Sequence, residues 1–194
     1  KGGIMIDFDW DNDLDIYYGF NNSYLFENIE GVFHNITDES EINTDGLIGV
    51  VAGDVDNNGY QDIIKQRIHE EDPHNLILNY GNHNYNTVEY LPSSFLTDLH
   101  GQGLLDADLD GDLDIFAIQD EGDTQAFLFL NQGINPFGEP EFIQSFSFPV
   151  DDLSTSRTIT IVDYDNDGDQ DIYVIRKFSI NWLLENQTLT GTPG

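Results

Sequence analysis

The stretch Asp106-Ala107-Asp108-Leu109-Asp110-Gly111-Asp112-Leu113-Asp114-Ile115 places aspartates at alternating positions and ends on an isoleucine. Three further segments align with it without gaps: Asp7–Ile16, Asp54–Ile63 and Asp163–Ile172. The shared form is D-x-D-x-[DN]-[GN]-x-x-D-I, and successive copies start 47, 52 and 57 residues apart. A repeat of this length fits one four-stranded blade of a β-propeller.

Short apolar runs flank every copy, one before it, one after it and a third further along. In the third copy these runs are Gly103–Leu105, Ile115–Ile118 and Phe127–Asn131, and Glu141–Ile143 forms a fourth. They are rich in β-branched and aromatic residues and bounded by Gly, Asn and Asp, which is typical of strands. No stretch shows a sustained helical period. Each repeat is therefore predicted to be an antiparallel meander whose first hairpin carries the acidic segment, and the last repeat has only three strands.

These repeats predict an all-β fold, a β-propeller-type array of about four four-stranded antiparallel blades. We expect a single repeat domain over residues 1–194, with blades near 1–37, 38–95, 96–150 and 151–194. One meander cannot bury both of its faces, so blades must stack on one another to form a core. The pattern leaves open whether four blades close a ring, form a partial propeller or are completed by other chains.

The acidic segments have the composition of calcium loops. Ca²⁺ takes about six to eight oxygen ligands, and acidic side chains at alternate loop positions can turn toward one centre. Positions 1, 3 and 5 supply three such groups, and the aspartate at position 9 closes the shell from the next strand. The predicted ligands are Asp7, Asp9, Asp11, Asp15, Asp54, Asp56, Asn58, Asp62, Asp106, Asp108, Asp110, Asp114, Asp163, Asp165, Asp167 and Asp171.

Four converging carboxylates repel one another strongly unless a cation lies between them. We therefore expect about four Ca²⁺ ions and a protein that is much less stable without them. Mg²⁺ suits these loops less well, because it demands octahedral geometry and retains its waters. Asn58 removes one negative charge from the second segment, which should be the weakest site. The alternative is that the segments are solvated acidic turns.

The charge balance limits the partners. The chain has 37 acidic and only 6 basic residues, a net charge of −31, and no cysteine. Such a chain repels nucleic acid and anionic membrane surfaces. It also has no apolar run long enough for a transmembrane helix. A solvated, halophile-type surface would give the same total, but here many of the acids cluster at metal-ligand spacing.

The stretch Tyr24–Ser40, continuing to Gly49–Asp54, is similar to the VCBS/FG-GAP repeat. The similarity is to the variety found beside ASPIC/UnbV segments and in cartilage acidic protein-like chains, and integrin α-subunit propellers share the calcium loop. The resemblance implies a β-propeller with mainly structural Ca²⁺ between the first two strands of each blade. It also implies an extracellular role in adhesion or ligand binding. Asn12, Asn58 and the small number of blades depart from the family pattern.

The resulting hypothesis is a non-enzymatic, calcium-binding adhesion, interaction or self-assembly module, secreted or on a cell surface. Its partner would be a protein, a glycan or another copy of the chain, so that the chain is an oligomer or part of a larger assembly. The alternatives are a lectin that stacks sugars on Trp10 or Tyr60 and a polysaccharide-active enzyme. The remaining acids are expected to be solvated: Glu70, Glu71, Asp120, Glu121 and Asp123. Sequons at Asn21, Asn35 and Asn186 would accept glycans if the source glycosylates.

Overall fold

A computed structural model of the protein describes residues 2–40, 42, 46–67, 74–91, 99–119, 125–149, 156–176 and 180–188. Over these residues the strands form four antiparallel sheets, three of four strands and one of three, and every strand pairs with its neighbour in sequence. The nearly all-β meander architecture predicted from the repeats is thus confirmed, and its blade arrangement fits a propeller. The chain divides into two compact units, Lys1–Thr97 and Asp98–Gly194.

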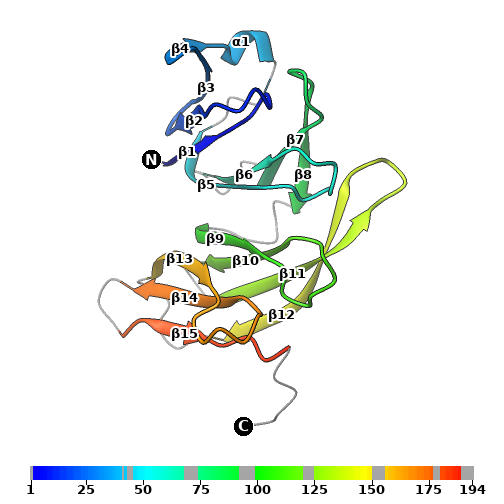
Figure 1. Ribbon diagram of the computed structural model, residues 1–194. Coiled ribbons are helices and arrows are strands. Elements are labelled where there is room, and N and C mark those ends of the chain that lie inside the picture. The colour runs from blue at the N-terminus through cyan, green and yellow to red at the C-terminus, as the bar shows by residue number, and fades with distance from the viewer. Residues whose placement is uncertain are drawn as a thin grey trace. The chain divides into compact units, whose positions relative to one another are not determined.

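The first unit contains two blades (Figure 1). Blade 1 consists of β1 (Gly2–Ile6), β2 (Asp15–Gly19), β3 (Ser23–Ile29) and β4 (Val32–Asn35), and blade 2 of β5 (Leu47–Gly53), β6 (Asp62–Arg67), β7 (His74–Asn79) and β8 (Tyr85–Leu91). The core between them includes Ile6, Phe8, Tyr17, Leu25, Leu47, Ile63 and Ile77. In blade 1 the core residues alternate with half-buried or exposed ones along the strands, as the period of two predicts.

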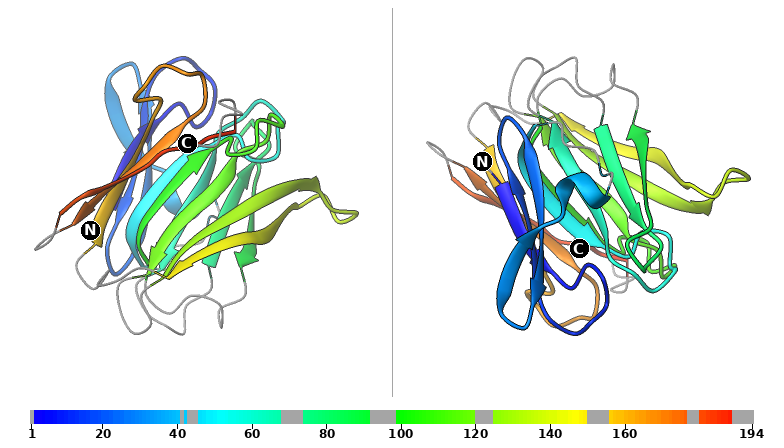
Figure 2. Two further views of the ribbon diagram at one scale, coloured as in Figure 1. Left: turned by 90° about the horizontal axis from the view of Figure 1, so that it is seen from below. Right: turned by 90° about the horizontal axis from the view of Figure 1, so that it is seen from above.

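The second unit is built in the same way. Blade 3 consists of β9 (Leu99–Leu105), β10 (Asp114–Gln119), β11 (Gln125–Ile134) and β12 (Pro140–Pro149), and blade 4 of β13 (Ser156–Val162), β14 (Asp171–Arg176) and β15 (Trp182–Leu184). Their shared core includes Leu105, Phe116, Ile118, Ala126, Ile172 and Val174. The β11–β12 hairpin extends beyond the rest of its sheet (Figure 2).

A glycine allows the two blades of the second unit to approach closely. A Cβ atom added to Gly103 in β9 would lie 2.8 Å from Cδ1 of Ile159 and 3.1 Å from Cδ1 of Ile161, both in β13. That space is therefore occupied by the isoleucines of the next blade, which pack directly on the backbone of β9.

One short helix departs from the all-strand expectation. α1 (Thr37–Ser40) is a single turn after β4. Thr37 Oγ1 accepts a hydrogen bond from Leu25 N at 3.0 Å, which ties this turn to β3. A four-residue turn is too short to produce a period that sequence inspection can detect.

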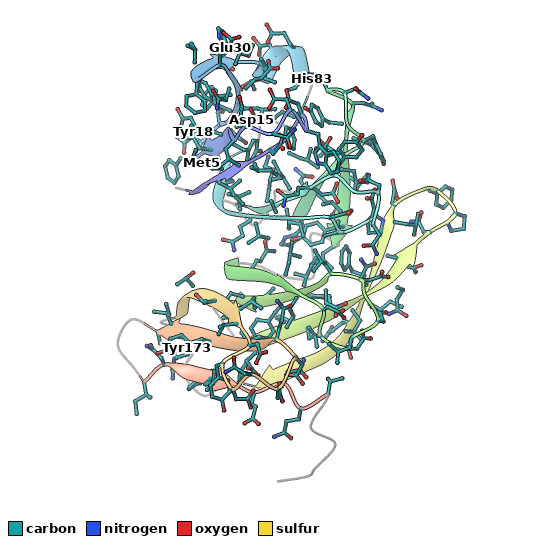
Figure 3. All side chains as sticks on the ribbon, viewed as in Figure 1. Met5, Asp15, Tyr18, Glu30, His83 and Tyr173 are labelled. Carbon is teal, nitrogen blue, oxygen red and sulfur yellow. The ribbon has the colours of Figure 1, made fainter. Side chains whose placement is uncertain are left out.

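One side of blade 1 is turned away from blade 2 and carries Met5, Tyr18, Tyr24 and Phe26. We call it the outer face of blade 1. Met5 and Tyr18 lie on the same side of the sheet (Figure 3) and are exposed. The Tyr18 ring lies 5.8 Å from the rings of both Tyr24 and Phe26. The outer face of blade 4 likewise exposes Val162, Tyr173, Ile175 and Leu183.

Candidate metal-binding loops

Each acidic segment is the hairpin loop between the first two strands of its blade. We name them loop I (Asp7–Asp15), loop II (Asp54–Asp62), loop III (Asp106–Asp114) and loop IV (Asp163–Asp171). The aspartate at position 9 is the first residue of the second strand, as predicted. Equivalent positions make nearly the same hydrogen bonds in all four loops, so the geometry can be described once.

The position-9 aspartate is buried in every loop and accepts a backbone N–H on each carboxylate oxygen. Oδ2 of Asp114 accepts from Ala107 N, at position 2 of the loop, at 2.8 Å, and Oδ1 accepts from Asn131 N at 2.8 Å. Asp15, Asp62 and Asp171 make the same pair of bonds at 2.8–3.0 Å. This aspartate therefore joins the loop to the end of the third strand of its blade.

Positions 1, 3 and 9 converge in all four loops. Each supplies a carboxylate oxygen, and within each loop these oxygens lie within 4.8 Å of one another. The groups are Asp7, Asp9 and Asp15; Asp54, Asp56 and Asp62; Asp106, Asp108 and Asp114; and Asp163, Asp165 and Asp171. Three hard oxygen donors at this separation match the first half of a calcium shell.

Position 5 is placed differently from the other predicted ligands. Among the described residues, the converging groups do not include Asp11, Asp110 or Asp167. Instead, Oδ1 of the position-5 side chain accepts the backbone N–H of position 7, at 3.0 Å for Asp11, 2.9 Å for Asp110 and 3.2 Å for Asp167. Position 5 thus shapes the loop, and its second oxygen is the one available to a ligand.

The position-1 aspartate has one carboxylate oxygen that is hydrogen-bonded and one that is not. Its Oδ2 accepts the backbone N–H of position 6, for example Gly111 N to Asp106 at 3.1 Å. Its Oδ1, however, is buried and has no hydrogen-bond donor in Asp7, Asp106 and Asp163. A buried carboxylate oxygen without a donor costs several kcal/mol unless a cation neutralises it. The donor set therefore fits a bound divalent cation in loops I, III and IV.

Two residues of each loop adopt left-handed backbone conformations. Position 6 does so as predicted, with φ of 75° at Asn12 and 96°–99° at the three glycines. Position 4 does so as well, at Trp10, Asn57, Leu109 and Asn166, with φ between 56° and 70°. The sequence gives no hint of this at Trp10 and Leu109, because bulky residues pay about 1–2 kcal/mol for that conformation.

An asparagine near the end of the third strand of each blade also belongs to the site, and residue spacing alone did not reveal its role. These residues are Asn28, Asn79, Asn131 and Asn186. Their backbone N–H groups donate to position 9, and two of their side chains also link neighbouring blades. Asn79 Nδ2 donates to Phe8 O of blade 1 at 2.9 Å, and Asn186 Nδ2 donates to Ala107 O of blade 3 at 3.1 Å. Their recurrence at the same point of each repeat was the available signal.

Burial raises the pKa of the position-9 carboxyls of loops I, II and III. Desolvation is the largest cause at Asp62 and Asp114, and it raises their pKa to about 7 and about 6, respectively. Hydrogen bonds from two backbone N–H groups oppose this rise, and neighbouring aspartates add to it. The pKa of Asp15 is also raised, mainly by burial. A bound cation would reverse this effect by favouring the charged carboxylates.

A histidine lies beside loop I. His83 Nε2 is 3.9 Å from Asp9 Oδ2 and 3.7 Å from Glu27 Oε1. His83 comes from the β7–β8 turn of blade 2, whereas both carboxylates belong to blade 1. Protonated His83 would therefore add a cation to this acidic edge of the interface between the two blades.

Two further predictions concern residues that are not predicted ligands. Trp10 is 56% exposed and its ring lies 5.0 Å from that of Tyr60, so it contacts the neighbouring loop and still presents an indole surface. The acids Glu70, Glu71, Asp120, Glu121 and Asp123 lie outside the described residues.

The family model for FG-GAP-like repeats matches residues 106–174, which include loops III and IV. This segment is similar to an FG-GAP-like repeat, which is consistent with the family resemblance found in the sequence. Such repeats typically occur in extracellular proteins and are generally non-enzymatic. No curated protein matches the chain. No helix in the described part of the chain is long and apolar enough to cross a membrane.

Proposed function

We propose that the protein is a calcium-stabilised, non-enzymatic interaction module of the extracellular space. The observation that carries the proposal is the buried Oδ1 atom of Asp7, Asp106 and Asp163, which has no hydrogen-bond donor. It recurs at the same position of three loops, next to the carboxylates of positions 3 and 9. Calcium would bind these oxygens and hold the first hairpin of each blade in place, supplying stability rather than chemistry.

Calcium titration tests this proposal. Thermal unfolding in millimolar Ca²⁺ and in excess chelator should differ strongly, because a ligand bound only by the folded state adds about 4 kcal/mol when present at a thousandfold its Kd. The Asp106→Asn variant should lose part of this difference, and equimolar Mg²⁺ should restore little of it. A control variant, Glu139→Gln in the β11–β12 turn, should behave like the wild type. Equal midpoints with Ca²⁺ and chelator would refute the calcium role.

The outer faces support self-association as the interaction. Inside the second unit, Leu105 and Phe116 of blade 3 pack against Ile161 and Ile172 of blade 4. With the first aspartate of each loop as position 1, Leu105 and Phe116 are at positions 0 and 11 of blade 3. Ile161 and Ile172 are at positions −1 and 10 of blade 4. The outer face of blade 4 presents the first pair of positions as Val162 and Tyr173. The outer face of blade 1 presents the second pair as Met5 and Ile16.

A second copy could therefore dock blade 4 of one chain on blade 1 of another through the contacts already used between blades. Contacts of this head-to-tail kind give rings or filaments. Light scattering in calcium should show assemblies larger than one chain, and Met5→Lys or Tyr173→Lys should reduce their mass. Phe137→Lys, at the exposed tip of the β11–β12 hairpin, is the control. A monomer at all concentrations would argue against self-association.

The exposed Trp10 indole supports the lectin as the second candidate. Aromatic faces bind sugars through their apolar surface, and here a cavity of about 830 Å³ is lined by Trp10, Asn12, Leu14 and Gln61, among others. A glycan array with the wild type and Trp10→Ala distinguishes this function: signals lost in the variant support it, and signals equal in both contradict it.

A further inference from the structure

Loop II differs from the other three loops at two positions. It has Asn58 at position 5 and Tyr60 at position 7, where loops I, III and IV have aspartates at both. Loop II therefore contains three carboxylates, and each of the others contains five. Fewer charges alone would only weaken a calcium site. Whether loop II needs an ion to fold depends on the hydrogen bonds that its remaining carboxylate oxygens accept.

The side chain of Asn58 donates to one of the three aspartates that converge in loop II. Its Nδ2 donates to Asp56 Oδ2 at 3.0 Å and to Asn79 O at 2.8 Å, while its Oδ1 accepts from Tyr60 N at 2.7 Å. The two acceptors on one side and the single donor on the other fix the orientation of the amide, because the flipped amide would oppose like groups. The amide thus places partial positive charge beside the Asp56 carboxylate.

Every carboxylate oxygen of loop II has an N–H donor. Asp54 accepts from Asn58 N at 3.0 Å and Gly59 N at 2.8 Å, one on each oxygen. Asp56 accepts from the backbone N and the Nδ2 of Asn58, and Asp62 accepts from two backbone N–H groups. The buried, donorless Oδ1 atom that marks position 1 in the other loops has no counterpart in Asp54.

At position 7, where the other loops have an aspartate, the Tyr60 side chain of loop II packs against its neighbours. Its ring lies 5.0 Å from the Trp10 ring of loop I. It also fills the space beside Gly81, where an added Cβ atom would lie 2.4 Å from Tyr60 Cζ. Gly81 has a φ of +74°, so both the space and the backbone conformation require glycine there. Loop II is thus held by an amide and an aromatic ring.

We propose that loop II folds without calcium, with the Asn58 amide in place of the ion, so that the protein binds three Ca²⁺ ions, in loops I, III and IV. Calcium entry into loop II would displace the Asn58 Nδ2 group and break its hydrogen bond to Asn79 O. The inference rests on the proposed calcium function and lowers the proposed number of ions from about four to three.

Counting bound ions by equilibrium dialysis tests the inference. We expect three Ca²⁺ per wild-type chain, four in Asn58→Asp and two in the matched control Asp110→Asn of loop III. Four ions in the wild type would overturn the inference while leaving the calcium function intact, and so would three in Asn58→Asp. No bound ion at all would refute the proposed function and, with it, this inference.

Thermal unfolding provides the second readout. Asn58→Ala should lower the midpoint by a similar amount in calcium and in chelator, because loop II uses the amide in both conditions. Asp110→Ala should lower it mainly in calcium. A loss in Asn58→Ala that appears only in calcium would overturn the inference, since it would show that Asn58 acts through an ion.

Discussion

At the scale of single residues, the four loops are held by carboxylates that act as acceptors before any ion is considered. Asp62 is fully buried, and both of its oxygens accept backbone N–H groups, from Val55 and Asn79. These bonds favour the charged form, but desolvation outweighs them and raises the pKa of Asp62 to about 7. Since loop II is proposed to hold no ion, this carboxyl should keep its raised pKa in calcium.

The raised pKa predicts how stability depends on pH. Folded Asp62 binds a proton more tightly than unfolded Asp62, so the folded state is favoured below the unfolded pKa, near 4. This contribution is lost as the pH rises through about 7. The free energy of unfolding in chelator should therefore fall between pH 5 and pH 8, by up to about 1.4 kcal/mol for each pH unit in which only the folded state is protonated.

Urea denaturation at a series of pH values measures this dependence. Calcium should remove the part due to Asp114, which a bound ion keeps charged, and leave the part due to Asp62. Asp62→Asn should be less stable at pH 5 and show a smaller slope. A wild-type stability that increases from pH 5 to pH 8 in chelator would contradict the prediction.

At the scale of elements, the strands and the hairpin loops were predictable because they follow from local, repeated patterns. The strands of blade 1 alternate in burial, and the position-9 aspartates lie where the second strand of each blade begins. The link between blades was not predictable from spacing, because it joins distant residues. Asn79 Nδ2 and Phe8 O, for instance, are 71 residues apart in sequence. The hydrogen bond from Asn58 to Asp56 was not predictable either. The residue pattern predicts Asn58 as a weak calcium ligand through its oxygen, whereas in the structure its NH₂ group donates to Asp56.

Among single side chains, Phe8 of loop I packs blade 1 against blade 2. It is 1% exposed, and its ring stacks on Tyr85 of β8 with centroids 4.5 Å apart. Phe8→Ala should therefore reduce the free energy of unfolding by about 3–5 kcal/mol, as large-to-small core substitutions do. Trp10→Ala, two residues along the same loop, removes a ring that is largely exposed and should cost about 1 kcal/mol or less. Chemical denaturation of both variants checks this, and equal losses would contradict it.

At the scale of the whole molecule, the net charge of −31 opposes folding through self-repulsion. Salt screens charges over about 10 Å at 0.1 M ionic strength, so sodium chloride should raise the melting midpoint of the calcium-free protein. The increase should be smaller in calcium, because the three proposed ions would offset six negative charges where the carboxylates are most crowded. Melting curves at increasing sodium chloride, each recorded with and without chelator, test this, and a midpoint independent of salt in chelator would argue against it.

The Asn58 amide in loop II is also open to deamidation. Asn58 precedes Gly59, the sequence context in which the next backbone nitrogen most readily attacks the side-chain amide carbon and expels ammonia. Water then opens the resulting succinimide to aspartate or isoaspartate. In the folded protein the Gly59 N–H is bound to Asp54 Oδ2 at 2.8 Å, which holds that nitrogen away from the reaction. Peptide mapping after storage should therefore find Asn58 intact in folded protein and deamidated in urea. A chain that is deamidated while unfolded and then refolds would have a carboxylate at position 5 of loop II. Its affinity for calcium at that loop would therefore change.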